Sequence, residues 1–165
     1  MNRKTSHAPA GEDLSLSKAA QIILDECRML LPGIQALFGF QLIAVFNQVF
    51  SEKLSSLEQQ LHLLAIGLVL LTTIIIMTPA AYHRQMEVQK VTQDFIHLAT
   101  TLMLVSMIPL AISICLEFYL VGQIILGNTG LAVLLSIGLF MMFFVFWIAL
   151  PRTSMLRRLL GNIRR

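Results

Sequence analysis

Few side chains in this sequence have the chemistry of a catalytic site, and none of them forms a familiar catalytic motif. The chain has no strained nucleophile turn, no glycine-rich phosphate loop and no CxxC pair. Its two cysteines, Cys27 and Cys115, stand in separate segments and do not form a disulfide framework. We therefore predict a protein that is not an enzyme and that has no cofactor.

The histidines are the side chains best suited to bind a metal or a haem. A b-type haem held between helices needs two histidines at one depth, and His83 and His97 flank the same polar loop. That position is shallow for a buried haem. Glu87 and Asp94 extend the pair to a weak set of metal ligands, which we expect to be solvated. We predict no metal site and keep a haem-binding anchor as a second alternative.

A more favourable group of polar residues is predicted at the inner surface of a membrane. We expect Asp25 or Glu26 to pair with Arg84, next to an interfacial Tyr82 and His83. The predicted cytoplasmic-side cluster contains Glu26, Arg28, Gln35, Tyr82, His83 and Arg84.

Side-chain amides lie in a segment that otherwise suits lipid. Gln41 and Gln48 are seven residues apart, so on a continuous helix they share one face, and Asn47 lies beside Gln48. Because an amide in hydrocarbon needs partners, we expect this face to be shielded from lipid. Contact between helices is favoured over contact with a substrate. Glu117 is expected to reach the outer headgroups and not to act as a proton relay.

These residues belong to a chain whose composition indicates a membrane protein. Of its 165 residues, 56% are hydrophobic and 13% are charged, against about 45–50% and about 25% in soluble domains. The mean hydropathy is +0.77. A soluble fold of this size would have too little polar surface.

The predicted fold class is all-α, a four-transmembrane-helix bundle preceded by an amphipathic surface helix. Polar and apolar residues alternate at helical spacing over residues 14–31, which predicts the interfacial helix, continuous with the first span or sharply bent at Pro32. Ser55 and Glu58 have the spacing of a capping box. The predicted segments are a disordered cytoplasmic tail at 1–13, a membrane domain at 30–150 with spans at about 30–50, 60–82, 95–120 and 131–150, and a basic cytoplasmic tail at 151–165.

The basic residues predict the orientation of the chain. Of twelve Lys and Arg residues, eleven fall in the two terminal segments and the loop between the second and third spans, and only Lys53 falls on the other side. The positive-inside rule then places both termini in the cytoplasm. This distribution explains the net charge of +3 without a nucleic-acid partner. Anionic lipid headgroups are the expected partners of Arg152, Arg157, Arg158, Arg164 and Arg165.

Two short strings suggest a relationship. The residues LPGIQALFGF at 31–40 and PAAYHR at 79–84 resemble an uncharacterised family of small bacterial four-span membrane proteins, sometimes labelled sodium:proton antiporter. The resemblance in organisation covers about residues 15–152 and implies a multi-pass protein of the bacterial inner membrane. It brings no established activity, substrate or cofactor.

The absence of catalytic motifs favours a non-enzymatic accessory or assembly subunit of a larger membrane complex. The alternative is a small oligomeric transporter or channel for a cation or proton, with its path between protomers because four short spans enclose little space. In either case the expected partner is another protein chain or a second copy of this one.

Overall fold

A computed structural model describes residues 15–85 and 92–152. In chain order its elements are α1 (Leu16–Val45), α2 (Gln48–Lys53), α3 (Ser56–Gln85), α4 (Gln93–Leu126), α5 (Thr129–Phe143), the π-helical η1 (Phe144–Ala149) and α6 (Leu150–Arg152). The described part is all-α, as predicted. The expected tail at 1–13 lies outside the described residues, as do Glu87, Arg157, Arg158, Arg164 and Arg165.

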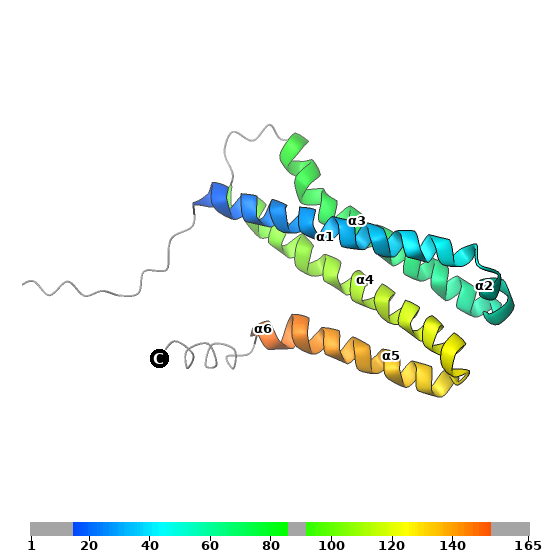
Figure 1. The fold of residues 1–165 in the computed structure, drawn as a ribbon. Helices are drawn as coiled ribbons and strands as arrows, with labels where there is room; N and C mark the ends of the chain where they lie inside the picture. The colour runs from blue at the N-terminus through cyan, green and yellow to red at the C-terminus, as the bar shows by residue number, and fades with distance from the viewer. Residues whose placement is uncertain (1–14, 86–91, 153–165) are drawn as a thin grey trace, which may run out of the picture.

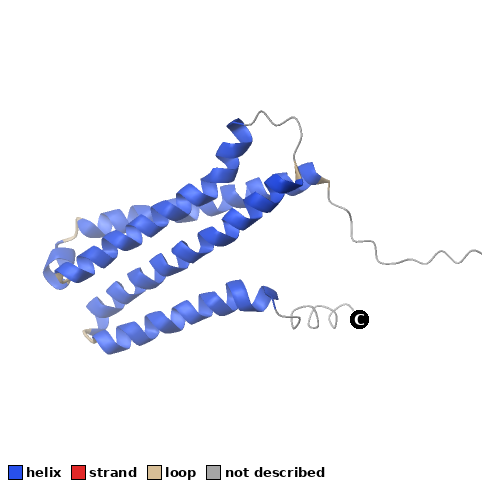
Figure 2. Ribbon diagram, turned by 180° about the vertical axis from the view of Figure 1, so that it is seen from behind, coloured by secondary structure: helices blue, strands red, loops and turns tan. Residues whose placement is uncertain are grey.

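Four helices of the described chain are long and apolar enough to cross a membrane: α1, α3, α4 and the continuous helix at 129–152. The shortest of them has 24 residues, or about 36 Å at about 1.5 Å per residue, enough for a hydrocarbon core of about 30 Å. They alternate in direction, so the start of α1, the end of α3, the start of α4 and α6 lie at one end (Figure 1). The same arrangement is seen from behind in Figure 2. In the described part of the chain, four helices that are long and apolar enough to span a membrane are thus confirmed.

Helix α1 unites the segments predicted as a surface helix and a first span. It continues through Pro32, so the sharp bend is absent and the continuous helix is found. Its buried residues are Ala20, Cys27, Ile34 and Gln41, spaced by seven. Pro32 has no backbone N–H to donate to the preceding turn of α1. The packing of the buried face of α1 before and after Pro32 offsets the loss of this hydrogen bond.

Helix α1 does not reach residue 50, the predicted end of the first span. Helix α1 ends at Val45, and Asn47 N–H donates to the carbonyl of Ala44 at 3.1 Å in the turn that follows. The six-residue α2 then leads into α3, so the polar residues after 45 belong to a cap over the bundle end.

Helices α3 and α4 pack with the spacing of a coiled coil. Apart from Ile66, the buried positions of α3 alternate between steps of four and three, and a stripe on α4 repeats every seven residues. This spacing keeps one seam of each helix in contact at a shallow crossing angle. The α3 positions are Glu58, His62, Ala65, Val69, Thr72, Ile76 and Pro79, and those of the α4 stripe are Ala99, Ser106, Ser113 and Leu120.

The apolar core lies between these seams and α1. Val69 and Ile76 of α3 pack with Cys27 and Ile34 of α1. Nearer the start of α1, Ala20 packs with Phe95 and Ala99 of α4. Residues of the expected surface helix therefore contribute to the core of the bundle.

Helix α5 packs mainly on α4 and diverges from it towards α6 (Figure 1). The two helices approach closely near their connection, where a Cβ on Gly122 would lie 3.4 Å from the Cβ of Ala132. Ser136 Oγ donates to the carbonyl of Cys115 at 2.6 Å. Farther along, η1 precedes Pro151, which has no N–H for the carbonyl of Trp147 and so favours a local change of helical pitch.

Candidate functional site

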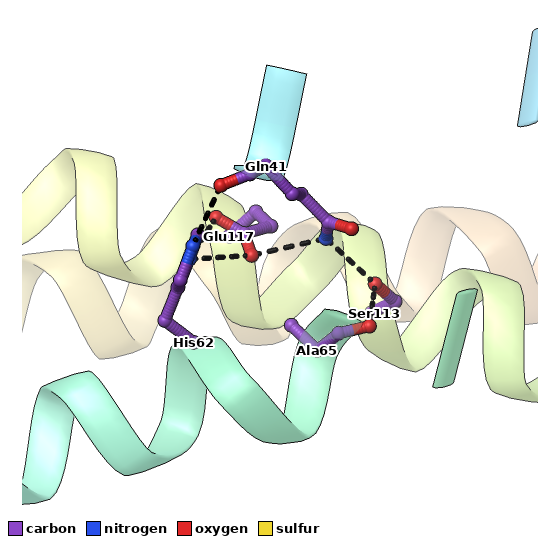
Figure 3. Close-up of polar contacts among 5 residues, drawn as sticks. All are labelled: Gln41, His62, Ala65, Ser113 and Glu117. Carbon is purple, nitrogen blue, oxygen red and sulfur yellow. Dashed lines mark hydrogen bonds and ion pairs between the residues drawn. The ribbon is translucent and has the colours of Figure 1, made fainter. Parts of the chain in front are cut away.

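The side chains that sequence reasoning had separated meet at the α2 end of the bundle (Figure 3). His62 of α3 places Nδ1 2.9 Å from Oε1 and 3.2 Å from Oε2 of Glu117 on α4. Its other ring nitrogen, Nε2, lies 3.0 Å from the backbone carbonyl oxygen of Gln41 on α1. One imidazole ring therefore links three helices.

The side chain of Gln41 extends the same network. Its Nε2 donates to Glu117 Oε1 at 3.0 Å and to Ser113 Oγ at 3.3 Å. Ser113 Oγ in turn donates to the carbonyl of Ala65 at 2.8 Å. We call Gln41, His62, Ser113, Glu117 and the Ala65 carbonyl the polar network.

The network is enclosed by protein. The side chain of His62 is 4% exposed, that of Glu117 is 19% exposed, and Gln41 is 3% exposed. From α2, the ring of Phe50 meets the His62 ring edge-on, with centroids 4.9 Å apart. A salt bridge with so little water around it is screened weakly, so its geometry matters more than that of a surface pair.

Local sequence chemistry fixes where α3 begins and hence where His62 lies. The Ser55 backbone N–H donates to Glu58 Oε2 at 2.8 Å, and the Glu58 N–H donates to Ser55 Oγ at 3.4 Å. This is the predicted capping box. His62 follows one turn later on the buried face, under α2.

One buried atom of the network has no protein partner. Within the described residues Gln41 Oε1 is buried and accepts no hydrogen bond. An unpaired buried acceptor costs about 1–3 kcal/mol, and such atoms occur where a structure has a role beyond stability. Gln41 Oε1 is free to accept from a water molecule or from a ligand N–H or O–H.

The structure shields one residue of the predicted amide face inside the bundle, and for the other two a shielding contact with a second protein chain stays a prediction. Gln41 is shielded from lipid, as expected, by contacts inside the bundle. Asn47 and Gln48 are exposed. The seven-residue spacing places Gln41 and Gln48 on one face only if the helix continues, and α1 ends before Asn47.

The expectation that Glu117 reaches the outer headgroups is also wrong. Its carboxylate turns into the bundle, where His62 and Gln41 bind it. The position near the end of a hydrophobic run suggested an interfacial carboxylate, but the helical phase places it one turn from Ser113 on the α3-facing side.

At the opposite end, the structure brings together only part of the predicted cytoplasmic-side cluster. Tyr82 and His83 gather around the buried ring of Phe95, with centroids 6.0 Å and 5.7 Å from it. Asp25 pairs with Arg28 on its own helix at 3.3 Å, not with Arg84. Five members of the predicted cluster are exposed: Glu26, Arg28, Gln35, Tyr82 and Arg84.

The remaining candidates show no joint site. His97 is exposed, and its backbone carbonyl accepts from Thr101 Oγ1 at 2.8 Å. No three His, Cys, Asp or Glu side chains come together as a metal site in the part of the chain that the structure describes. Arg152 is exposed at the end of α6.

Comparison with known proteins gives one match. A model of a family of unknown function, DUF6328, matches residues 14–151, and the chain therefore belongs to this family. The expectation of an uncharacterised family is confirmed, whereas the antiporter label and a bacterial source do not come with the match. Neither the curated proteins nor the solved structures include a match to the chain.

Proposed function

We propose that this member of the DUF6328 family is a non-enzymatic accessory or assembly subunit of a larger membrane complex, located in a bacterial inner membrane with both termini in the cytoplasm. The proposal rests on one observation, the contrast between a closed core and an open fourth helix. The polar network and the apolar core hold α1, α3 and α4 together, and α1 buries Ala20, Cys27, Ile34 and Gln41, whereas Ala132 is the one buried residue in the described helix from α5 to α6.

The open side carries a groove that residues 15–85 and 92–152 do not fill. It has a volume of about 660 Å³ and lies between α4 and the continuous helix of α5 and η1, lined among others by Val105, Ile108, Phe140, Phe144 and Trp147. In a membrane, an apolar groove of this size is filled either by lipid acyl chains or by the side chains of another helix, and we propose the second occupant. A transmembrane helix of a partner subunit supplies the apolar side chains that fit it.

Native mass measurement of the complex extracted in mild detergent tests this proposal. We expect a defined assembly that contains at least one unrelated membrane chain. A photo-crosslinking residue in place of Phe140, in the groove, should join the two chains, whereas the same residue in place of the exposed Leu63 on α3 should not. A monomer or a pure homo-oligomer, with no heteromeric product from either position, would contradict the proposal.

A second candidate function, a small cation or proton transporter, is supported by the ionisable pair inside the bundle. Ionisable side chains within membrane bundles commonly belong to ion or proton pathways. The polar network itself does not continue along the bundle. From Ser113 towards the end of the bundle opposite to α2, the buried hydroxyls of Thr72 and Ser106 donate to carbonyls of their own helices. The core in this direction contains the apolar side chains of Ile34, Val69 and Ile76.

Transport would therefore need a path formed with a second protomer. Purified protein in liposomes distinguishes the two functions. Proton or sodium flux above that of empty vesicles, lost in a Glu117→Gln variant, would establish the transporter. An absence of flux together with a heteromeric native mass is what the subunit proposal predicts.

A further inference from the structure

The hydrogen bonds of His62 define how many protons the polar network contains. Its Nε2 faces a backbone carbonyl oxygen, which only accepts, so Nε2 carries a hydrogen atom. Its Nδ1 faces the carboxyl group of Glu117 at 2.9 Å, and a second hydrogen atom lies between these two groups. Without that atom a nitrogen lone pair would point at a carboxylate oxygen.

The pair therefore holds two protons and has no net charge. The two protons can be placed in two ways: His62 is an imidazolium and Glu117 a carboxylate, or His62 is a neutral imidazole and Glu117 a carboxylic acid. Each of these states holds one proton more than a neutral His62 beside an ionised Glu117. Gln41 Nε2, which donates to Glu117 Oε1, stabilises negative charge on that oxygen and so favours the imidazolium form.

We propose that His62 and Glu117 form a proton-binding site at the α2 end of the bundle, which takes up and releases one proton. Release leaves a net charge of −1 in a little-hydrated site and breaks the hydrogen bond between Nδ1 and the carboxylate. This hydrogen bond between α3 and α4 is therefore present in the protonated state and lost in the other, while the bond from Ser113 Oγ to the Ala65 carbonyl is present in both. This inference concerns a site and holds whichever partner the chain has.

Of the ionisable side chains near the α2 end of the bundle, we assign the proton exchange to the pair of His62 and Glu117. On α3, the carboxylate of Glu58 is engaged by the N–H and hydroxyl of Ser55. On α2, Glu52 and Lys53 are exposed. The charged residue of α4 at this depth is Glu117 itself, with the buried thiol of Cys115 and the partly exposed phenol of Tyr119 two residues away. The helix α1 contributes the uncharged Gln41.

Exchange of the proton takes place on one side. Glu117 is the most exposed titratable member of the polar network, at 19%, and lies at the α2 end. Towards the opposite end the way is closed by the apolar cluster of Cys27, Ile34, Val69 and Ile76. The predicted orientation makes the α2 end the outer side, so the site senses the pH outside.

Nuclear magnetic resonance of the full chain in lipid nanodiscs tests the proposal, with ¹⁵N-labelled histidine rings and ¹³C-labelled glutamate carboxyl groups. The His62 signals are assigned by their loss in His62→Gln. At neutral pH we expect two protons on the pair, seen as two protonated ring nitrogens, or as one with a protonated Glu117 carboxyl. Raising the pH should remove one of them.

The Glu117→Gln variant provides a matched control, because its amide can donate to Nδ1 while Nε2–H still donates to Gln41. We expect this variant to release one proton fewer per chain than the wild type over the same titration, whereas Glu58→Gln should keep the wild-type signals of His62.

One protonated ring nitrogen beside an ionised Glu117 at neutral pH would overturn the proposal. So would a pair that keeps both protons at every pH at which the bundle stays folded. Both of these readouts are taken on the wild type, and if His62→Gln fails to fold, the His62 signals are assigned by the loss of the other histidine signals in variants at the other three histidines, which include His83 and the exposed His97.

Discussion

Gln41 connects three helices through both its backbone and its side chain. Its carbonyl accepts from His62 on α3, and its amide donates to Glu117 and Ser113 on α4. A leucine at this position keeps the size and removes the amide, so two acceptors lose a donor in a buried site. The backbone bond to His62 remains.

We expect Gln41→Leu to lower the free energy of unfolding by about 1–2 kcal/mol, while insertion into the membrane is unchanged. Gln35→Leu is the control, because Gln35 lies on the same helix and is exposed. Reversible unfolding in mixed micelles measures both variants. Equal stability of Gln41→Leu and the wild type would show that the amide has no structural role.

The proton on the His62–Glu117 pair predicts a pH dependence with a definite sign. The folded pair holds its second proton through a hydrogen bond that the unfolded chain lacks. In the pH range in which the pair releases this proton, the folded chain therefore binds more protons than the unfolded chain. Stability then falls with increasing pH in that range. Glu117→Gln removes the proton and should flatten this part of the profile, measured by thermal unfolding in nanodiscs. A wild type that gains stability in the same range would contradict the assignment.

At the scale of elements, the start of α3 depends on a reciprocal cap. Ser55 Oγ accepts from the Glu58 N–H, and the Glu58 carboxylate accepts from the Ser55 N–H. We expect Ser55→Ala to lower the free energy of unfolding by about 1 kcal/mol and to loosen the first turn before His62. Ser56→Ala, at the neighbouring exposed position, should have little effect. Hydrogen exchange of the first turn of α3 reports the difference, and equal exchange in both variants would argue against the cap.

Hydropathy predicts the helices well and their ends less well. The predicted spans at 60–82, 95–120 and 131–150 fall inside the helices of the structure, which continue past the apolar runs because polar residues also form helical hydrogen bonds. The end of α1 was misplaced because no charged residue occurs between Arg28 and Glu52, so Asn47 and Gln48 were assigned to a polar face of the span and not to its end.

The polar network was missed for a different reason. His62 and Glu117 are 55 residues apart, and each lies near the end of an apolar run, where a charged group is expected to reach water. Only the packing of α3 on α4 shows that both face the seam. A signal was present in the spacing, because Ser113 and Glu117 are four residues apart on α4 and Ser106, Ser113 and Leu120 repeat by sevens. Gln41 was identified from sequence because an amide in a span always needs a partner.

At the scale of the whole molecule, the ends of the helices divide into two groups. The end of α3 and the start of α4 lie with the start of α1 and with α6, and α2 lies at the other end (Figure 1). We expect a membrane-impermeant thiol reagent to label Glu52→Cys from outside intact cells and to leave Asp94→Cys unlabelled until the cells are opened. The native Cys27 and Cys115 are buried and provide a low background. The opposite labelling pattern would reverse the predicted orientation.

A double-mutant cycle on unfolding tests most directly whether the bundle is held together by the pair of His62 and Glu117. The two single alanine variants and the double variant are compared with the wild type in the same micelles, and a cycle of His62 with the exposed His97 is the control. We expect a coupling of about 1–3 kcal/mol between His62 and Glu117 and additivity within about 0.5 kcal/mol for the control pair. Additive effects of His62→Ala and Glu117→Ala would contradict the account.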